Sequence, residues 1–137
     1  MKNNYQLIDD GPIETSTVIT IDSKSGKMIK HWGSNLFYLP HGLTVDSGFL
    51  WLTDVGLHQI FKFPIDGSQQ PLITLGQRFI PGNSENNFCK PTSVAIYSVN
   101  KDIYVADGYC NSRIARFNSD GKFLNQWGHS NPIGNFY

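Results

Sequence analysis

One histidine and one tyrosine stand out in this sequence for the chemistry they could do. His41 follows Pro40 at the start of an alternating apolar segment, and Tyr109 lies in the string Asp107-Gly108-Tyr109-Cys110. An imidazole can hold a metal ion, although a catalytic zinc uses three protein ligands. A phenol can act as a general base when a cation lies close to it. Two plainer interpretations stay open: His41 hydrogen-bonded to a neighbouring sheet, and Tyr109 packed on its own loop.

The two cysteines of the chain allow two interpretations. Cys89 ends a long polar segment, and Cys110 directly follows Tyr109. They are either two separate buried thiols or a disulfide that joins the segments 76–90 and 108–111. A disulfide would indicate an oxidising compartment. Closing a loop of about 20 residues would stabilise the fold by roughly 3 kcal/mol.

The remaining histidines and one arginine are expected to be structural. We place His31 in the outer part of a sheet, His58 at the start of a strand and His129 in a loop. Arg113 follows the cysteine segment, and we expect it to pair with an acidic residue such as Asp107 rather than to act in catalysis.

All these residues lie on a repeated pattern. The segments 40–46, 50–54 and 58–63 return as 91–96, 103–107 and 112–117. A period of about 50 residues made of short alternating segments predicts stacked β-sheet units of a repeat fold. Asp54 and Asp107 occupy matching positions in the two copies, so we expect them to cap the turn after the second strand of each unit.

The pattern predicts an all-β chain with no helix. Strands are expected at 18–21, 28–32, 39–46, 49–53, 59–63, 72–75, 92–97, 102–106, 113–117 and 122–127, after a polar lead-in at 1–16. The division expected is a half repeat at 17–33, repeats at 34–76 and 77–128, and the start of a truncated repeat at 129–137. Because propellers have typically 4–8 blades, we expect an open arc of two to three blades, a fragment of a larger ring.

Charge and hydropathy exclude several classes of function. Eleven basic and eleven acidic residues give a net charge of zero, and no basic cluster offers a nucleic-acid site. No apolar run is long enough for a transmembrane segment within the chain. The first six residues lack the apolar run of a signal peptide.

Five strings in the chain resemble the NHL-repeat family of β-propellers, and within it the lyase domain of peptidylglycine α-amidating enzymes. The strings are Gly11–Glu14, Asn35–Leu43, Thr53–Val55 with His58-Gln59, Phe88-Cys89 with Pro91-Thr92, and Asp107–Arg113. The resemblance implies a six-bladed ring and a carbon–nitrogen lyase. Such an enzyme cleaves peptidyl-α-hydroxyglycine into a peptide amide and glyoxylate, the step that completes C-terminal amidation in neuropeptide processing.

The same resemblance implies roles for individual residues. His41 matches the first of three zinc histidines, the carbonyl of Leu43 matches a ligand of a structural Ca²⁺, Tyr109 matches the catalytic tyrosine, and Cys89 with Cys110 match a disulfide. It further implies a protein of the secretory pathway or the extracellular space, peptides ending in α-hydroxyglycine as partners, and an attached monooxygenase domain in some parent proteins. The other two zinc histidines and the substrate-binding arginine have no counterpart here, so we expect these 137 residues alone to be inactive.

Two rival classes of function fit the same repeat. A non-enzymatic NHL propeller that serves as an interaction scaffold would lack the Tyr-Cys insertion and often has a basic face. A calcium-dependent lactone or ester hydrolase would need acidic and Asn ligands at the strand starts, where this chain has His41 and Thr92.

Overall fold

The computed structural model describes residues 11–129, and all of the regular structure within that range is β-strand. The first sheet has two strands, β1 (Val18–Ile21) and β2 (Met28–Trp32). The second has four: β3 (Pro40–Asp46), β4 (Phe49–Asp54), β5 (Gln59–Pro64) and β6 (Ile73–Leu75). The third also has four: β7 (Ser93–Ile96), β8 (Ile103–Asp107), β9 (Ser112–Phe117) and β10 (Phe123–His129).

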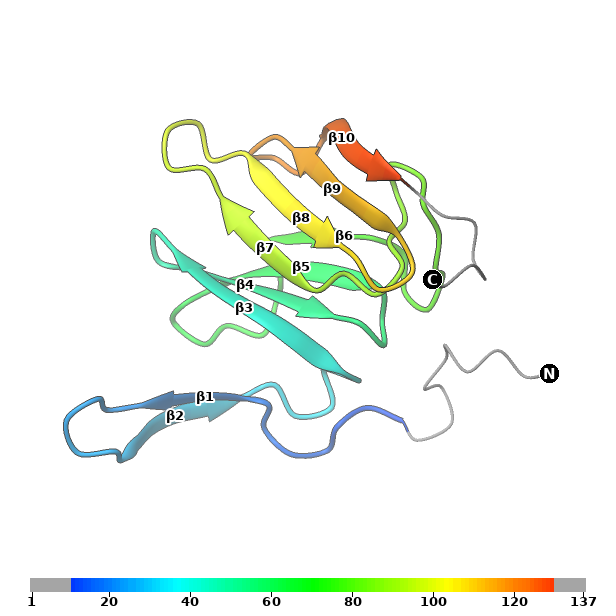
Figure 1. Ribbon diagram of the computed structural model, residues 1–137. Helices are drawn as coiled ribbons and strands as arrows, with labels where there is room; N and C mark the ends of the chain where they lie inside the picture. The colour runs from blue at the N-terminus through cyan, green and yellow to red at the C-terminus, as the bar shows by residue number, and fades with distance from the viewer. Residues whose placement is uncertain (1–10, 130–137) are drawn as a thin grey trace.

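Each four-stranded sheet is an antiparallel meander whose spatial order follows the chain, β3-β4-β5-β6 and β7-β8-β9-β10. The three sheets are stacked, and β3 and β7 lie side by side at one edge of the stack (Figure 1). This arrangement is an open arc of a β-propeller, which confirms the all-β fold expected from the sequence. Between residues 11 and 129 there is no long apolar helix of the kind that crosses a membrane.

The second sheet is apolar on both faces because it lies between the other two. Successive side chains of a strand point to opposite faces, so Leu50 and Leu52 of β4 face one neighbour while Trp51 faces the other. The cluster toward the first sheet contains Val18, Trp32, Phe37, Leu50, Leu52 and Phe63. The cluster toward the third sheet contains Trp51, Ile60, Leu75, Phe88, Val94, Ile103, Val105, Ala115 and Phe117.

Asp54 caps the turn after β4, as its recurrence in the repeat predicts. Its buried carboxylate accepts hydrogen bonds from the backbone N–H groups of Gly56 and Leu57 in the turn. It also accepts from the N–H groups of Tyr38 and Leu39 in the segment that leads into β3. One carboxylate therefore fixes two loops at the same end of the second sheet.

The end of the third sheet differs from the sequence expectation. His129 is the last residue of β10, not a loop residue, because β10 continues to pair with β9 up to His129 opposite Ser112. The truncated repeat expected at 129–137 lies, from residue 130 on, outside the described residues, as do residues 1–10 of the lead-in segment.

Candidate functional site

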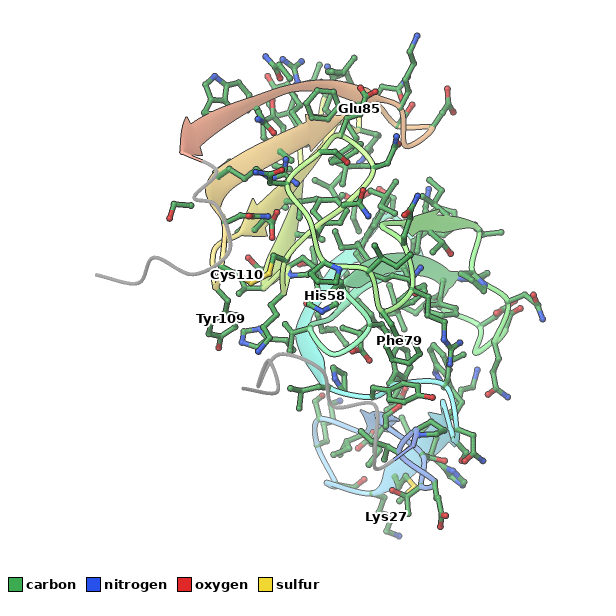
Figure 2. The ribbon with its side chains drawn as sticks, turned by 90° about the vertical axis from the view of Figure 1, so that its right-hand side faces the viewer. Lys27, His58, Phe79, Glu85, Tyr109 and Cys110 are labelled. Atoms are coloured by element: carbon green, nitrogen blue, oxygen red, sulfur yellow. A yellow bond between two sulfur atoms is a disulfide. The ribbon has the colours of Figure 1, made fainter. Side chains whose placement is uncertain are left out.

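His41 and Tyr109 come from neighbouring sheets and meet at one end of the stack. His41 lies near the start of β3, and Tyr109 lies in the 108–111 loop between β8 and β9. The Nε2 atom of His41 is 3.1 Å from the Tyr109 hydroxyl, and their ring planes are 86° apart. Both side chains are exposed. Figure 2 looks onto this end of the molecule, with Tyr109 and Cys110 at the edge of the third sheet.

The hydrogen bonds of His41 determine which ring nitrogen carries the proton. Nδ1 is 2.9 Å from the carbonyl oxygen of Thr92, which can only accept, so Nδ1 donates. Nε2 then carries the lone pair, and the Tyr109 hydroxyl donates to it. Metal-ligating histidines usually have one ring N–H held by a backbone carbonyl, so that the other nitrogen can bind the metal. In His41 that other nitrogen, Nε2, here accepts from Tyr109. This bonding also agrees with the plainer interpretation of a histidine bonded to a neighbouring sheet.

Gly42 allows β3 to approach β7 closely enough for this contact. A Cβ atom at residue 42 would lie 2.4 Å from the carbonyl oxygen of Thr92. The N–H of Gly42 donates to the Thr53 hydroxyl, which in turn donates to the same Thr92 oxygen. The position of His41 is therefore set by the contact between the second and third sheets.

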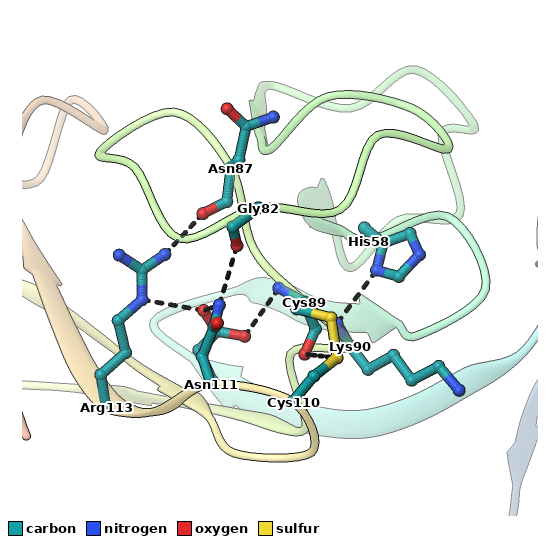
Figure 3. The surroundings of a disulfide bond; sticks show 9 residues. His58, Gly82, Asn87, Cys89, Lys90, Cys110, Asn111 and Arg113 are labelled. Atoms are coloured by element: carbon teal, nitrogen blue, oxygen red, sulfur yellow. Dashed lines mark hydrogen bonds and ion pairs between the residues drawn. A yellow bond between two sulfur atoms is a disulfide. The ribbon is translucent and has the colours of Figure 1, made fainter. Parts of the chain in front are cut away.

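The two cysteines form a disulfide beside Tyr109. Their Cα atoms are 5.5 Å apart, inside the usual range for disulfides. This confirms the disulfide interpretation over two separate thiols. Cys89 is buried at the end of the segment 76–90, and Cys110 lies in the loop that carries Tyr109. The disulfide therefore ties this loop to that segment (Figure 3).

Arg113 has the structural role expected from the sequence. Its buried guanidinium donates from Nε to Asp107 at 2.9 Å, and from Nη1 and Nη2 to the carbonyl oxygens of Asn83 and Asn87. Burial raises the pKa of Asp107, while hydrogen bonds from Asn111 and Arg113 act against that rise. The pair thus fastens the segment 76–90 to the third sheet.

His58 is structural, as the sequence predicts, and the structure adds a hydrogen bond to the segment 76–90 that the sequence does not predict. It lies in the turn before β5, and its side chain is completely buried. Nδ1 accepts a hydrogen bond of 3.0 Å from the Lys90 N–H. Burial, together with the charge of Lys90, lowers the pKa of His58 to about 4, so the ring is neutral at ordinary pH. The one sequence signal is that the other repeat copy has Ser112, not histidine, at the matching position.

The described residues include no group of three or more His, Cys, Asp and Glu side chains that could hold a metal ion. His41 therefore offers one imidazole of a possible set. Leu43 lies two residues further along β3 and is exposed. A pocket of about 370 Å³ opens beside His41, with Val18, Phe37 and Leu52 among its lining residues.

Comparison with known proteins identifies the repeat and a set of relatives. The NHL repeat model matches residues 37–63 and 88–117. The chain is 51% identical, over 89% of its length, to peptidyl-alpha-hydroxyglycine alpha-amidating lyase 2 of Drosophila melanogaster. It is 50% identical, over 90% of its length, to peptidyl-glycine alpha-amidating monooxygenase A of Xenopus laevis. A probable peptidyl-alpha-hydroxyglycine alpha-amidating lyase of Caenorhabditis elegans is 47% identical over 86% of the chain. The chain spans 30%, 13% and 33% of these three relatives.

Proposed function

We propose that this chain, which belongs to the NHL-repeat family of peptidyl-α-hydroxyglycine α-amidating lyases, carries part of the active site of such a lyase. The contact between Tyr109 and His41 is the observation that supports this most strongly. The two residues lie 68 positions apart in the chain and on different sheets, yet the Tyr109 hydroxyl is 3.1 Å from Nε2 of His41. Both are exposed, so a substrate can reach them.

The proposed reaction is the collapse of a carbinolamide. The hydroxyl group of the α-hydroxyglycine loses its proton, and the carbon–nitrogen bond breaks with its electron pair on nitrogen. That nitrogen takes up a proton to give the peptide amide, while the carbinol carbon becomes the aldehyde of glyoxylate. Tyr109 would accept the hydroxyl proton as general base, and its loop is held for this task by the Cys89–Cys110 disulfide.

Zinc and calcium belong to this proposal. His41 would hold the zinc through Nε2, since Nδ1–H is already bonded to the Thr92 carbonyl. A zinc ion there would supply electrostatic stabilisation to an oxygen that becomes negative. Binding at Nε2 would take away the acceptor of the Tyr109 hydroxyl and leave the phenol free for the substrate. The carbonyl oxygen of Leu43 would serve a structural Ca²⁺, a cation that takes oxygen ligands.

The compartment and the partners follow from the same proposal. The disulfide is compatible with an oxidising compartment, and we assign the protein to the secretory pathway or the extracellular space. Its substrates would be peptides ending in α-hydroxyglycine. Relatives named monooxygenases include a region similar to this chain, so a monooxygenase domain in the same protein would supply the hydroxylated peptide.

The experiment is a turnover assay on the complete gene product with a peptide ending in α-hydroxyglycine. We expect release of glyoxylate and peptide amide, with turnover lowered at least about a hundredfold in Tyr109→Phe. Tyr104→Phe is the matched control, because Tyr104 stacks on Trp127 in the third sheet. Full activity of Tyr109→Phe would contradict the base role. No turnover by the wild type would contradict the lyase assignment and favour the interaction scaffold.

A further inference from the structure

His58 is held rigidly in a turn that faces the long loop at 76–90. Its backbone has a left-handed φ of 59°, a conformation that is uncommon outside glycine and in which asparagine, aspartate and histidine are enriched. The carboxylate of Asp54 fixes the turn through the N–H groups of Gly56 and Leu57. The side chain is therefore directed into the interior by a strongly determined backbone.

Only one of the two ring nitrogens of His58 has a hydrogen-bond partner among the described residues. Nδ1 accepts from the Lys90 N–H, so the hydrogen of the neutral ring is on Nε2. Within residues 11–129, Nε2 is buried and has no hydrogen-bond partner. A buried donor without a partner costs about 1–3 kcal/mol, a cost that an apolar side chain would avoid. The hydrogen bond that Nδ1 accepts from the Lys90 N–H therefore explains why a histidine occupies this position.

The bond to Nδ1 holds one of the two half-cystines in place. Lys90 itself has a left-handed φ of 60°, and the preceding N–H, that of Cys89, donates to Asp107 at 2.9 Å. The backbone of Cys89 and Lys90 is thus held by two hydrogen bonds. One goes to His58, next to the second sheet, and the other goes to Asp107 of the third sheet. Figure 3 shows the bond between the Lys90 N–H and His58 next to the Cys89–Cys110 disulfide. Cys110, on the other side of that disulfide, is the neighbour of Tyr109.

We propose that His58 is a positioning residue for Tyr109, acting through the Lys90 N–H and the Cys89–Cys110 disulfide. When zinc occupies Nε2 of His41, the direct contact between His41 and Tyr109 is lost, and the second sheet then holds Tyr109 through His58. The inference rests on the proposed lyase function, because it concerns the placement of the phenol for that reaction. It assigns His58 no contact with substrate or metal.

Two substitutions distinguish a role of Nδ1 as a hydrogen-bond acceptor from a role of the His58 side chain in packing alone. His58→Asn places an amide oxygen where Nδ1 stands, and asparagine tolerates the left-handed backbone. His58→Gln carries the same amide one methylene further, away from the Lys90 N–H. His31→Gln is the control, since His31 is exposed on β2 and bonds to Ser16. The wild type and these three variants are each compared as the complete gene product with zinc supplied.

The first measurement is steady-state turnover of a hydroxyglycine-terminated peptide, and the second is the rate at which dithiothreitol reduces the Cys89–Cys110 disulfide. In His58→Gln we expect kcat to fall about tenfold with KM unchanged, the signature of a misplaced catalytic group, and reduction to be faster. In His58→Asn and His31→Gln both quantities should stay close to wild type.

The outcomes separate the two proposals. Unchanged kcat and unchanged reduction rate in folded His58→Gln would overturn the positioning role. Equal losses in His58→Asn and His58→Gln would also overturn it, since packing would then matter and the acceptor would not. An inactive wild type would contradict the lyase function instead, and the reduction rates would still show whether His58 holds the disulfide loop.

Discussion

The buried, neutral imidazole of His58 makes the fold sensitive to acid in a predictable range. Its pKa is lowered from 6.5 to about 4. The unfolded chain therefore binds a proton more tightly than the folded one, and stability is lost as the pH falls from above 6.5 toward 4. Each pKa unit corresponds to about 1.4 kcal/mol. We expect the free energy of unfolding to drop by about 2 kcal/mol between pH 7 and pH 5 from this residue alone.

The other groups with shifted pKa values do not produce the same loss of stability between pH 7 and pH 5. The charge of Lys90 contributes to the lowered pKa of His58, and backbone N–H groups of the turn donate to the Asp54 carboxylate. The pKa values of Asp22 and Asp46 are lowered from the ordinary aspartate value, so these two residues change stability only at a pH below the interval from 7 to 5. The raised pKa of Asp107 has the opposite sign, because a carboxyl that takes up its proton early in the folded state gains stability as the pH falls.

The assay is urea unfolding of the complete gene product at pH 7 and pH 5, followed by tryptophan fluorescence. His58→Asn keeps the acceptor for Lys90 but cannot titrate, so it should lose about 2 kcal/mol less than wild type over this interval. Equal losses in the two proteins would refute the reasoning, since they would show that His58 titrates alike in the folded and unfolded chain.

Four further variants test how the fold and the site are supported. Replacing both cysteines by serine should lower stability by roughly 3 kcal/mol, measured by denaturant unfolding; a loss below 1 kcal/mol would show that the loop is fixed without the disulfide. Arg113→Met should cost about 3–5 kcal/mol, because it leaves the buried Asp107 carboxylate unpaired; Arg116→Met, at a partly exposed pair, should cost less. Phe63→Ala should cost about 3–5 kcal/mol by thermal unfolding, since Phe63 is fully buried between the first and second sheets; an unchanged midpoint would contradict that packing.

The sequence was enough to predict the strands because their pattern is local. The alternating segments and the turn residues recur in two copies, and the observed strands begin and end within two residues of the expected ones. Asp54 bonds the N–H groups of its own turn, as expected. Its repeat counterpart Asp107 instead accepts from the Cys89 N–H and from the side chains of Asn111 and Arg113.

The loops between the strands were harder to predict because long-range contacts shape them. Nothing periodic in the segment 76–90 indicates that its carbonyl oxygens accept from Arg113, or that Lys90 bonds to His58. The family resemblance pointed to His41 and Tyr109 as site residues, and the structure places them 3.1 Å apart. The proton position on His41 could not be predicted, because it depends on a Thr92 carbonyl of another sheet.

The most direct test of the account is the zinc content of the complete gene product measured together with its lyase turnover, for wild type, His41→Ala and His31→Ala. The account predicts bound zinc and glyoxylate release in wild type and in His31→Ala. It predicts the loss of both in His41→Ala, since Nε2 of His41 is the proposed ligand beside Tyr109. A His41→Ala protein that keeps its zinc and its turnover would contradict the account.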